Sequence, residues 1–196
     1  MFILGLSGGM GMGKSATTDY LRSLYIPVHD SDAAVHRLMQ KGEPVYNKLK
    51  SIIPKAALGD NIDRKVLSAR IKEDPHFLKT LEAIIHPEVR KDRTRFIHHQ
   101  ALKGQKLVVA DVPLLFETGL YKECNANAIV DCPRWLQEQR ILKRGISVEK
   151  MRVLLNNQWS NEQRKLYADY IINTGLSFAH SRRQIRAMLR DIQPKI

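Results

Sequence analysis

A run of glycines lies directly before a lysine near the start of the sequence. Residues 8–15 read GGMGMGKS, which fits the pattern G-x-x-x-x-G-K-[S/T] at every specified position. Such glycines allow backbone N–H groups to turn toward phosphate oxygens, and here Lys14 would reach the β- and γ-phosphates while Ser15 holds Mg²⁺. The pattern predicts a loop that binds ATP and Mg²⁺, comprising Gly9, Gly11, Met12, Gly13, Lys14, Ser15 and Ala16.

Three carboxylates stand where they could serve phosphoryl transfer. Asp30 and Asp32 follow one apolar run, and Asp111 ends another. A carboxylate facing the loop can orient an attacking hydroxyl and accept its proton, the role predicted for Asp32. A carboxylate ending a strand can bind Mg²⁺ directly or through water, the role predicted for Asp111. Helix capping is the alternative for each of the three, because Asp is a favoured N-cap residue.

Two arginines and one asparagine could complete a nucleotide site. Arg140 and Arg144 are four residues apart in a basic helical segment, so they would share one helix face. Guanidinium groups there could neutralise charge on a transferring phosphoryl group, with Arg140 as a charge stabiliser. A solvated surface is the alternative for both. Asn173 follows the last apolar run, where a loop could pass under an adenine.

Five short apolar runs must position these residues. They predict strands at 2–7, 26–29, 106–111, 127–132 and 169–173. Helix-length segments separate most of them, including predicted helices at 16–25 and 178–192. This alternation is typical of an α/β protein with a parallel sheet covered by helices on both faces.

Two helical insertions interrupt the alternation. Residues 33–104 show helical spacing, with one helix through Phe77 and Ile85, a break at Pro87 and a second helix through Phe96. Residues 134–165 are charged, basic and helical. We expect a single domain with a core at 1–32, 105–133 and 166–196, an acceptor-binding helical lobe at 33–104 and a lid at 134–165.

Composition and charge limit the partners. No run approaches the roughly 18 apolar residues that a membrane span needs, and the first residues lack the pattern of a signal peptide. The two cysteines, Cys124 and Cys132, fit neither a metal site nor a disulfide framework, so a reducing cytoplasm is expected. A net charge of +12 favours a polyanion, either nucleic acid or a phosphorylated small molecule. A monomer is slightly favoured.

Together these motifs resemble the dephospho-coenzyme A kinase family, over nearly the whole chain. The most specific parts are DVPLLFE at 111–117 and the His-Pro pair of IIHP at 84–87. The other matching parts are the glycine loop, the D-x-D of Asp30 and Asp32, the QR at 139–140 with Arg144 downstream, and the AD at 168–169 with Asn173.

The resemblance implies a P-loop kinase fold like that of the nucleoside monophosphate kinases. That fold has three layers around a five-stranded parallel sheet, with a helical acceptor-binding lobe and a helical lid. The implied reaction is ATP-dependent phosphorylation of the ribose 3′-hydroxyl of dephospho-coenzyme A, the final step of coenzyme A synthesis. Asp32 would orient or deprotonate that hydroxyl, and Lys14 and Arg140 would stabilise charge. The implied substrate-binding residues are Asp32, His86, Pro87 and Leu114.

Three residues depart from the pattern of that family. Ala16 stands where the family usually has Thr, which removes one hydroxyl contact to a phosphate and predicts modestly weaker ATP binding. Ser31 replaces Ala, and Met12 replaces a common Ser, without loss of a group that the chemistry needs.

Two other functions stay open at this point. One is a P-loop kinase for another small molecule, nucleoside or nucleotide. The other is a P-loop switch or a nucleic-acid-dependent ATPase, suggested by the basic charge. The sequence lacks an N-K-x-D motif, and no aromatic cluster interrupts its basic segments. We therefore expect a small-molecule substrate and no nucleic acid.

Overall fold

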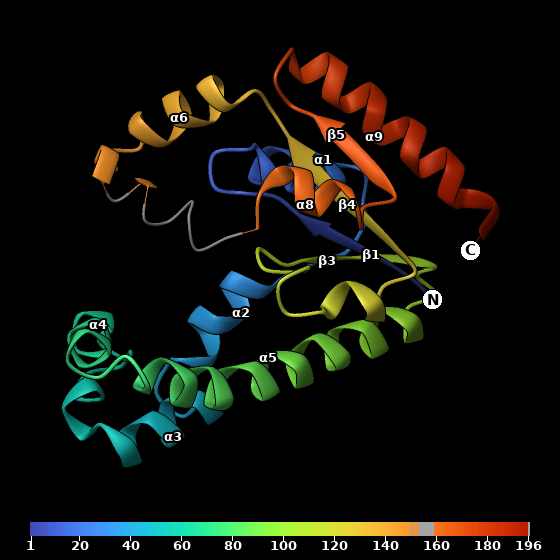
Figure 1. Ribbon diagram of the computed structural model, residues 1–196. Coiled ribbons are helices and arrows are strands. Elements are labelled where there is room, and N and C mark those ends of the chain that lie inside the picture. Colours follow the sequence, from blue (N-terminus) through green and yellow to red (C-terminus); the bar gives the residue numbers. More distant parts are fainter. Residues whose placement is uncertain (150, 153–158, 196) are drawn as a thin grey trace. The chain divides into compact units, whose positions relative to one another are not determined.

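The computed structural model describes residues 1–149, 151–152 and 159–195 (Figure 1). Its contacts divide the chain into two compact units. The sheet unit comprises Met1–His29 and Gln100–Ile196, and the helical unit comprises Asp30–His99. The division into core, acceptor lobe and lid stays a prediction, and residues 150 and 153–158 of the predicted lid lie outside the described residues.

Five strands form one parallel sheet, so the predicted fold class is confirmed. They are β1 (Phe2–Ser7), β2 (Val28–Asp30), β3 (Leu107–Asp111), β4 (Ala126–Asp131) and β5 (Tyr170–Asn173), in the order β2-β3-β1-β4-β5. Each predicted strand is present, with small shifts at its ends. In the register of β1 with β3, Leu6 lies opposite Asp111. The segment after β1 and the carboxylate that ends β3 therefore lie at the same edge of the sheet.

The sheet is apolar at successive positions because both of its faces are covered, as parallel strands require. One face packs against α1 (Lys14–Ser23) and α9 (Phe178–Ile192) through a cluster that includes Leu4, Leu6, Leu21, Val130 and Ile185. The other face packs against the segment after β3 through Ala110, Leu115, Phe116 and Ile129. This rigid frame holds the carboxyl ends of the strands, from which the loops of the site emerge.

Two shorter α-helices also belong to the described part of the sheet unit. Helix α6 (Arg134–Leu142) follows β4, and α8 (Asn161–Lys165) precedes β5. Helix α8 begins with a capping box, in which Ser160 and Gln163 bind each other's backbone N–H groups. Within the described part of the chain, no helix combines the length and the apolar character that a membrane span needs.

The helical unit has its own hydrophobic core. Its elements are α2 (Ser31–Leu38), α3 (Pro44–Ile52), the 3₁₀ helix η1 (Pro54–Ala56), α4 (Arg64–Glu73) and α5 (Phe77–Leu102), the last three residues of which belong to the sheet unit. Leu38, Tyr46 and Leu49 are buried at its centre. The Tyr46 hydroxyl donates to the carbonyl of Ala57 at 2.9 Å, which fixes the turn after α3.

The predicted break at Pro87 is wrong. Helix α5 continues through Pro87 as a single element. A proline inside a helix lacks one N–H donor and crowds the preceding turn, at a cost of about 3 kcal/mol. Buried side chains lie on both sides of it, namely Phe77, Leu81, Glu88 and Arg93. Tertiary packing of these residues therefore outweighs the local preference for a break.

Candidate active site

The glycine loop, residues 8–15, joins β1 to α1 at the centre of the sheet. Gly11 and Gly13 have φ angles of 78° and 93°, in the left-handed region that favours glycine. Space adds a second reason at Gly13, because a Cβ there would lie 2.9 Å from Oγ1 of Thr174. Gly13 is also the N-cap residue of α1. The loop thus ends at a helix N-terminus, where free N–H groups and the helix dipole favour an anion.

Lys14 and Thr18 of α1 both bind the carboxylate of Asp111. The Lys14 ammonium forms an ion pair with Oδ1, and the Thr18 hydroxyl donates to Oδ2 at 2.8 Å. Asp111 is 2% exposed, so its charge is balanced almost entirely by these partners. Asp111 therefore binds side chains of the loop helix and does not act as a helix cap. The Ser15 side chain, by contrast, is exposed at the start of α1.

Residues far along the chain hold the loop from outside. Thr174, directly after β5, donates through its hydroxyl to the carbonyl of Met12 at 2.5 Å. Arg140 of α6 donates to the carbonyl of Gly11 at 3.3 Å and to that of Thr174 at 2.8 Å. The predicted charge stabiliser therefore lies against the loop, and it joins α6 to the segment after β5.

A pocket of about 680 Å³ opens beside the loop, within the size range of small-molecule sites. Six predicted residues line it, namely Gly11, Gly13, Ser15, Ala16, Arg140 and Arg144. Leu176, in the segment after β5, and Phe178, the first residue of α9, also line it, and each is 73% exposed. The pocket thus combines the anion-binding loop, two guanidinium groups and an apolar wall.

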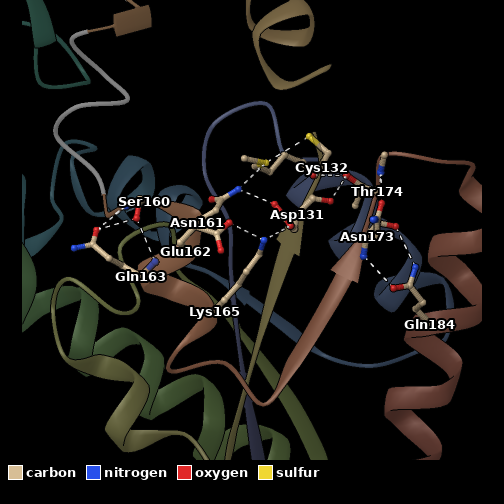
Figure 2. A network of polar contacts seen from close by, with 12 residues as sticks. Asp131, Cys132, Ser160, Asn161, Glu162, Gln163, Lys165, Asn173, Thr174 and Gln184 are labelled. Atoms are coloured by element: carbon tan, nitrogen blue, oxygen red, sulfur yellow. Dashed lines mark hydrogen bonds and ion pairs between the residues drawn. The ribbon is translucent and has the colours of Figure 1, made fainter. Parts of the chain in front are cut away.

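Asn173 shapes the segment after β5 and is not one of the pocket residues. Its side-chain oxygen accepts from the N–H of Gly175 at 2.8 Å, and its own N–H donates to the Gln184 side chain at 3.0 Å (Figure 2). The asparagine therefore sets the turn that carries Thr174 to the loop.

Asp131, at the end of β4, is the centre of a second polar network (Figure 2). It accepts from Asn161 at 2.7 Å and pairs with the Lys165 ammonium at 2.9 Å. The hydrogen bond to Asp131, followed by that to Glu162, raises the pKa of Lys165 and keeps it charged. Burial raises the pKa of the neighbouring Cys132 thiol. These contacts attach α8 to the edge of the sheet that carries the glycine loop.

The predicted acceptor residues are distributed over both units. Asp30 is the N-cap of α2, and its carboxylate accepts from the N–H of Ala33 at 3.0 Å. Asp32 lies in the first turn of the same helix. His86 and Pro87 lie within α5 of the helical unit, whereas Leu114 belongs to the sheet unit, in the segment after β3. The observed role of Asp30 is therefore that of a helix cap. Asp32 stays the predicted carboxylate that orients the acceptor hydroxyl.

Sequence reasoning missed several residues that hold the loop. Three of them lie against the loop itself, namely Gln137, Arg164 and Thr174. The fourth, Thr18, binds Asp111, the carboxylate that pairs with Lys14. The only signal for Thr174 was its place after the last predicted strand. Arg164 and Gln137 lie in basic helical sequence that offers no local mark of their burial.

A strand, a glycine loop ending in Lys-Ser and a helix, at the centre of a five-stranded parallel sheet, define a P-loop kinase fold. Residues 2–179 match the family model described as Dephospho-CoA kinase. The chain belongs to the dephospho-coenzyme A kinase family, as its motifs predicted. It is therefore a phosphotransferase of coenzyme A synthesis with ATP as the phosphoryl donor.

Curated relatives agree over the full length. The dephospho-CoA kinase of Novosphingobium aromaticivorans is 40% identical over 196 residues, covering 99% of this chain and 96% of that protein. That of Rhizobium meliloti is 38% identical over 194 residues, covering 98% and 99%.

Solved structures share the fold. TT1252 from Thermus thermophilus is 31% identical with a TM-score of 0.81, covering 97% of each chain. Dephospho-CoA kinase from Campylobacter jejuni is 22% identical with a TM-score of 0.73, covering 99% of this chain and 98% of that one. A shikimate kinase from Acinetobacter baumannii is 19% identical with a TM-score of 0.54, covering 97% and 94%. The last two likenesses show the fold alone.

Proposed function

We propose that the pocket beside the glycine loop binds ATP, and that the γ-phosphate passes from there to the ribose 3′-hydroxyl of dephospho-coenzyme A. The observation that carries this proposal is the continuity of three features in the sheet unit. The loop and its lysine, the Arg140 and Arg144 guanidiniums, and the apolar side chains of Leu176 and Phe178 border one pocket. These are the groups that a triphosphate joined to a flat base needs.

Each part of ATP has a matching part of the site. The triphosphate lies in the loop, where backbone N–H groups and Lys14 bind its oxygens. The base lies against the apolar side chains of Leu176 and Phe178. Arg140 contacts the loop already, so a small movement of its guanidinium brings it onto the transferring phosphoryl group. Ala16 lines the pocket and carries no hydroxyl, and modestly weaker ATP binding stays a prediction.

The chemistry of two side chains fits Mg²⁺. Mg²⁺ prefers oxygen ligands and is commonly held by one or two carboxylates, substrate phosphates and water. The exposed Ser15 hydroxyl and the buried carboxylate of Asp111 supply two oxygen donors at the phosphate loop. When bound, Mg²⁺ would neutralise phosphate charge. The ammonium of Lys14 pairs with the same Asp111 carboxylate, so the phosphate-binding lysine and the proposed Mg²⁺ ligand are in direct contact.

The acceptor would be aligned by Asp32 of α2. Asp32 stands two residues beyond the last residue of β2, and β2 lies next to β3 in the sheet. A carboxylate that starts from this edge can accept the proton of the 3′-hydroxyl and direct its oxygen at the γ-phosphate. His86, Pro87 and Leu114 would shape the acceptor side. Because the transition state is loose, alignment and fixed positive charge supply most of the acceleration.

The expected setting of this reaction is the cytoplasm. Both cysteines are free thiols, which supports a reducing compartment. The slightly favoured monomeric state stays a prediction.

A coupled ADP-release assay tests the proposal. Mg-ATP is offered with dephospho-coenzyme A, with adenosine, with AMP and with no acceptor, and the product mass is measured. We expect one added phosphate on dephospho-coenzyme A alone. Rapid ADP release without an acceptor, or faster phosphorylation of adenosine or AMP, would overturn the assignment of the acceptor.

A further inference from the structure

Among the described residues, Arg164 is a charged side chain that lies almost fully buried beside the glycine loop. It lies in α8 and is 1% exposed. Its Nη2 donates to Oε1 of Glu117 at 2.7 Å. Arginine is rarely buried to this extent, and a buried ion pair is weak evidence for stability in itself. Its position therefore calls for a reason other than packing.

The second terminal nitrogen of Arg164 lies against the loop. Nη1 is 3.1 Å from the position that a Cβ on Gly9 would occupy. Gln137 reaches the same stretch, with Nε2 at 3.3 Å from that position and a hydrogen bond of 2.8 Å to the carbonyl of Met10. Gly9 has no left-handed φ angle, so close packing and not backbone conformation is what favours glycine there. Two nitrogen-bearing side chains, those of Arg164 and Gln137, thus lie against the first half of the loop at Gly9.

Glu117 orients the guanidinium of Arg164. It is the last residue of the DVPLLFE motif, and the function described above gives it no role. Besides Arg164, its Oε1 accepts from the backbone N–H of Trp159 at 3.0 Å. One carboxylate oxygen therefore fixes both the entry to α8 and the arginine within it. The capping box of α8 and the ion pair of Lys165 with Asp131 anchor the same helix to the sheet (Figure 2).

We propose that Arg164, held by Glu117, is a positioning residue for phosphoryl transfer. It sets the backbone of the glycine loop at Gly9, and with it the N–H groups that receive the terminal phosphates of ATP. This inference rests on the proposed binding of ATP by the loop. Preorganised donors are effective only when they stand where charge develops, so a small displacement of the loop lowers the rate without removing any catalytic group.

A double-mutant cycle between Gly9 and Arg164 tests the contact. Arg164→Lys keeps a positive charge for Glu117 but loses the forked head that reaches Gly9, and kcat should fall roughly 10-fold. Gly9→Ala crowds the same space and should lower kcat to a similar degree. In the double variant the slimmer lysine relieves the crowding. The fold-decrease in kcat of the double variant should therefore be at least about twofold smaller than the product of the fold-decreases of the two single variants.

Two further variants separate positioning from folding. Glu162→Gln lies on the exposed face of the same helix and removes only the pair with Lys165, so kcat and melting temperature should stay close to wild type. Glu117→Gln keeps an acceptor oxygen but removes the negative charge that holds the guanidinium, so ATP affinity should fall while the protein stays folded. Each variant is assayed well below its own melting temperature, with ATP affinity measured by calorimetry.

Three results would overturn the proposal. The first is a folded Arg164→Lys variant with wild-type kcat, KM and ATP affinity. The second is a pair of losses that multiply as independent effects. The third is an ATP affinity unchanged by Glu117→Gln, which also decides the matter if Arg164→Lys fails to fold. Calorimetry needs no acceptor, so a wild-type protein that binds ATP but leaves dephospho-coenzyme A unmodified would refute the proposed acceptor and not this inference.

Discussion

Lys14, in the glycine loop after β1, forms an ion pair with Asp111 at the end of the neighbouring strand β3. The lysine that would bind phosphate is therefore already held at the floor of the loop by a buried carboxylate. An arriving triphosphate competes with Asp111 for the ammonium. If Lys14 turned to the phosphates, Oδ1 of Asp111 would become available to another cation, and nucleotide binding would then be coupled to the proposed binding of Mg²⁺.

Asp111→Asn should uncouple the binding of nucleotide from the binding of Mg²⁺. The amide keeps the shape of the side chain but loses its charge, so we expect kcat/KM for ATP to fall roughly 10- to 100-fold, the range for losing a charged hydrogen bond. The Mg²⁺ concentration for half-maximal rate should rise. Thr18→Val is the matched control, because it removes only the hydroxyl bond to Oδ2 and should leave the Mg²⁺ dependence nearly unchanged. Equal Mg²⁺ titrations for wild type and Asp111→Asn would contradict a metal role.

Asp32→Asn should lower kcat by about 10²-fold or more, the usual scale of a general-base contribution, with ATP affinity nearly intact. Asp30→Asn serves as the comparison, since asparagine caps helices as well as aspartate does and the observed role of Asp30 is a cap. Steady-state kinetics and ATP calorimetry of the two variants decide the assignment. Near-wild-type turnover of Asp32→Asn would remove that residue from the mechanism.

Arg140→Ala should reduce kcat far more than Arg183→Ala. Arg140 binds the loop and the segment after β5, whereas Arg183 is exposed on α9. A donor that stabilises transition-state charge is worth about 10²- to 10³-fold, and an exposed arginine away from the pocket should be worth almost nothing. Small and equal effects on turnover would mean that Arg140 holds the loop without contributing to phosphoryl transfer.

Glu88→Gln tests the packing that carries α5 through Pro87. Hydrogen bonds from Lys48 and then Lys91 lower the pKa of Glu88 below its ordinary value of 4.5. Its stabilising effect is therefore complete above that value and is lost as the pH falls through the lowered pKa. Both lysines are half-exposed or more, so we expect a loss of about 1 kcal/mol and a fall in Tm of about 2–4 °C at pH 7. The difference from wild type should vanish in acid; a difference that is independent of pH would contradict the ionic cause.

Much of the sheet unit could be predicted because its signals are local. The five strands are continuous apolar runs, and the glycine loop is a contiguous motif with a lysine and a serine at set positions. Asp111 could be placed because the register of parallel strands brings the end of β3 beside the end of β1. Helix α9 was predicted with its observed bounds, since its apolar positions repeat at helical spacing.

The features that could not be predicted depend on contacts between residues far apart in the sequence, and local sequence patterns do not reveal such contacts. Nothing near Pro87 reveals that buried neighbours will carry α5 through it. Nothing near Arg164 in its basic segment reveals that it is buried, since the cause lies at Glu117, 47 residues away. For Asp30, local sequence left capping and catalysis open, and only the observed bond to Ala33 distinguishes them.

During synthesis, the glycine loop is made long before the residues that hold it. The hydroxyl that binds Met12 belongs to a residue 162 positions later in the chain, and Gln137 follows Met10 by 127. At about 5–20 residues per second, roughly 8–30 s pass between the appearance of the loop and that of Thr174. Within that interval, β1 lacks both of its neighbours in the sheet until β3 and then β4 emerge. The ATP-binding loop is therefore among the first parts of this enzyme to be made and among the last to acquire its shape.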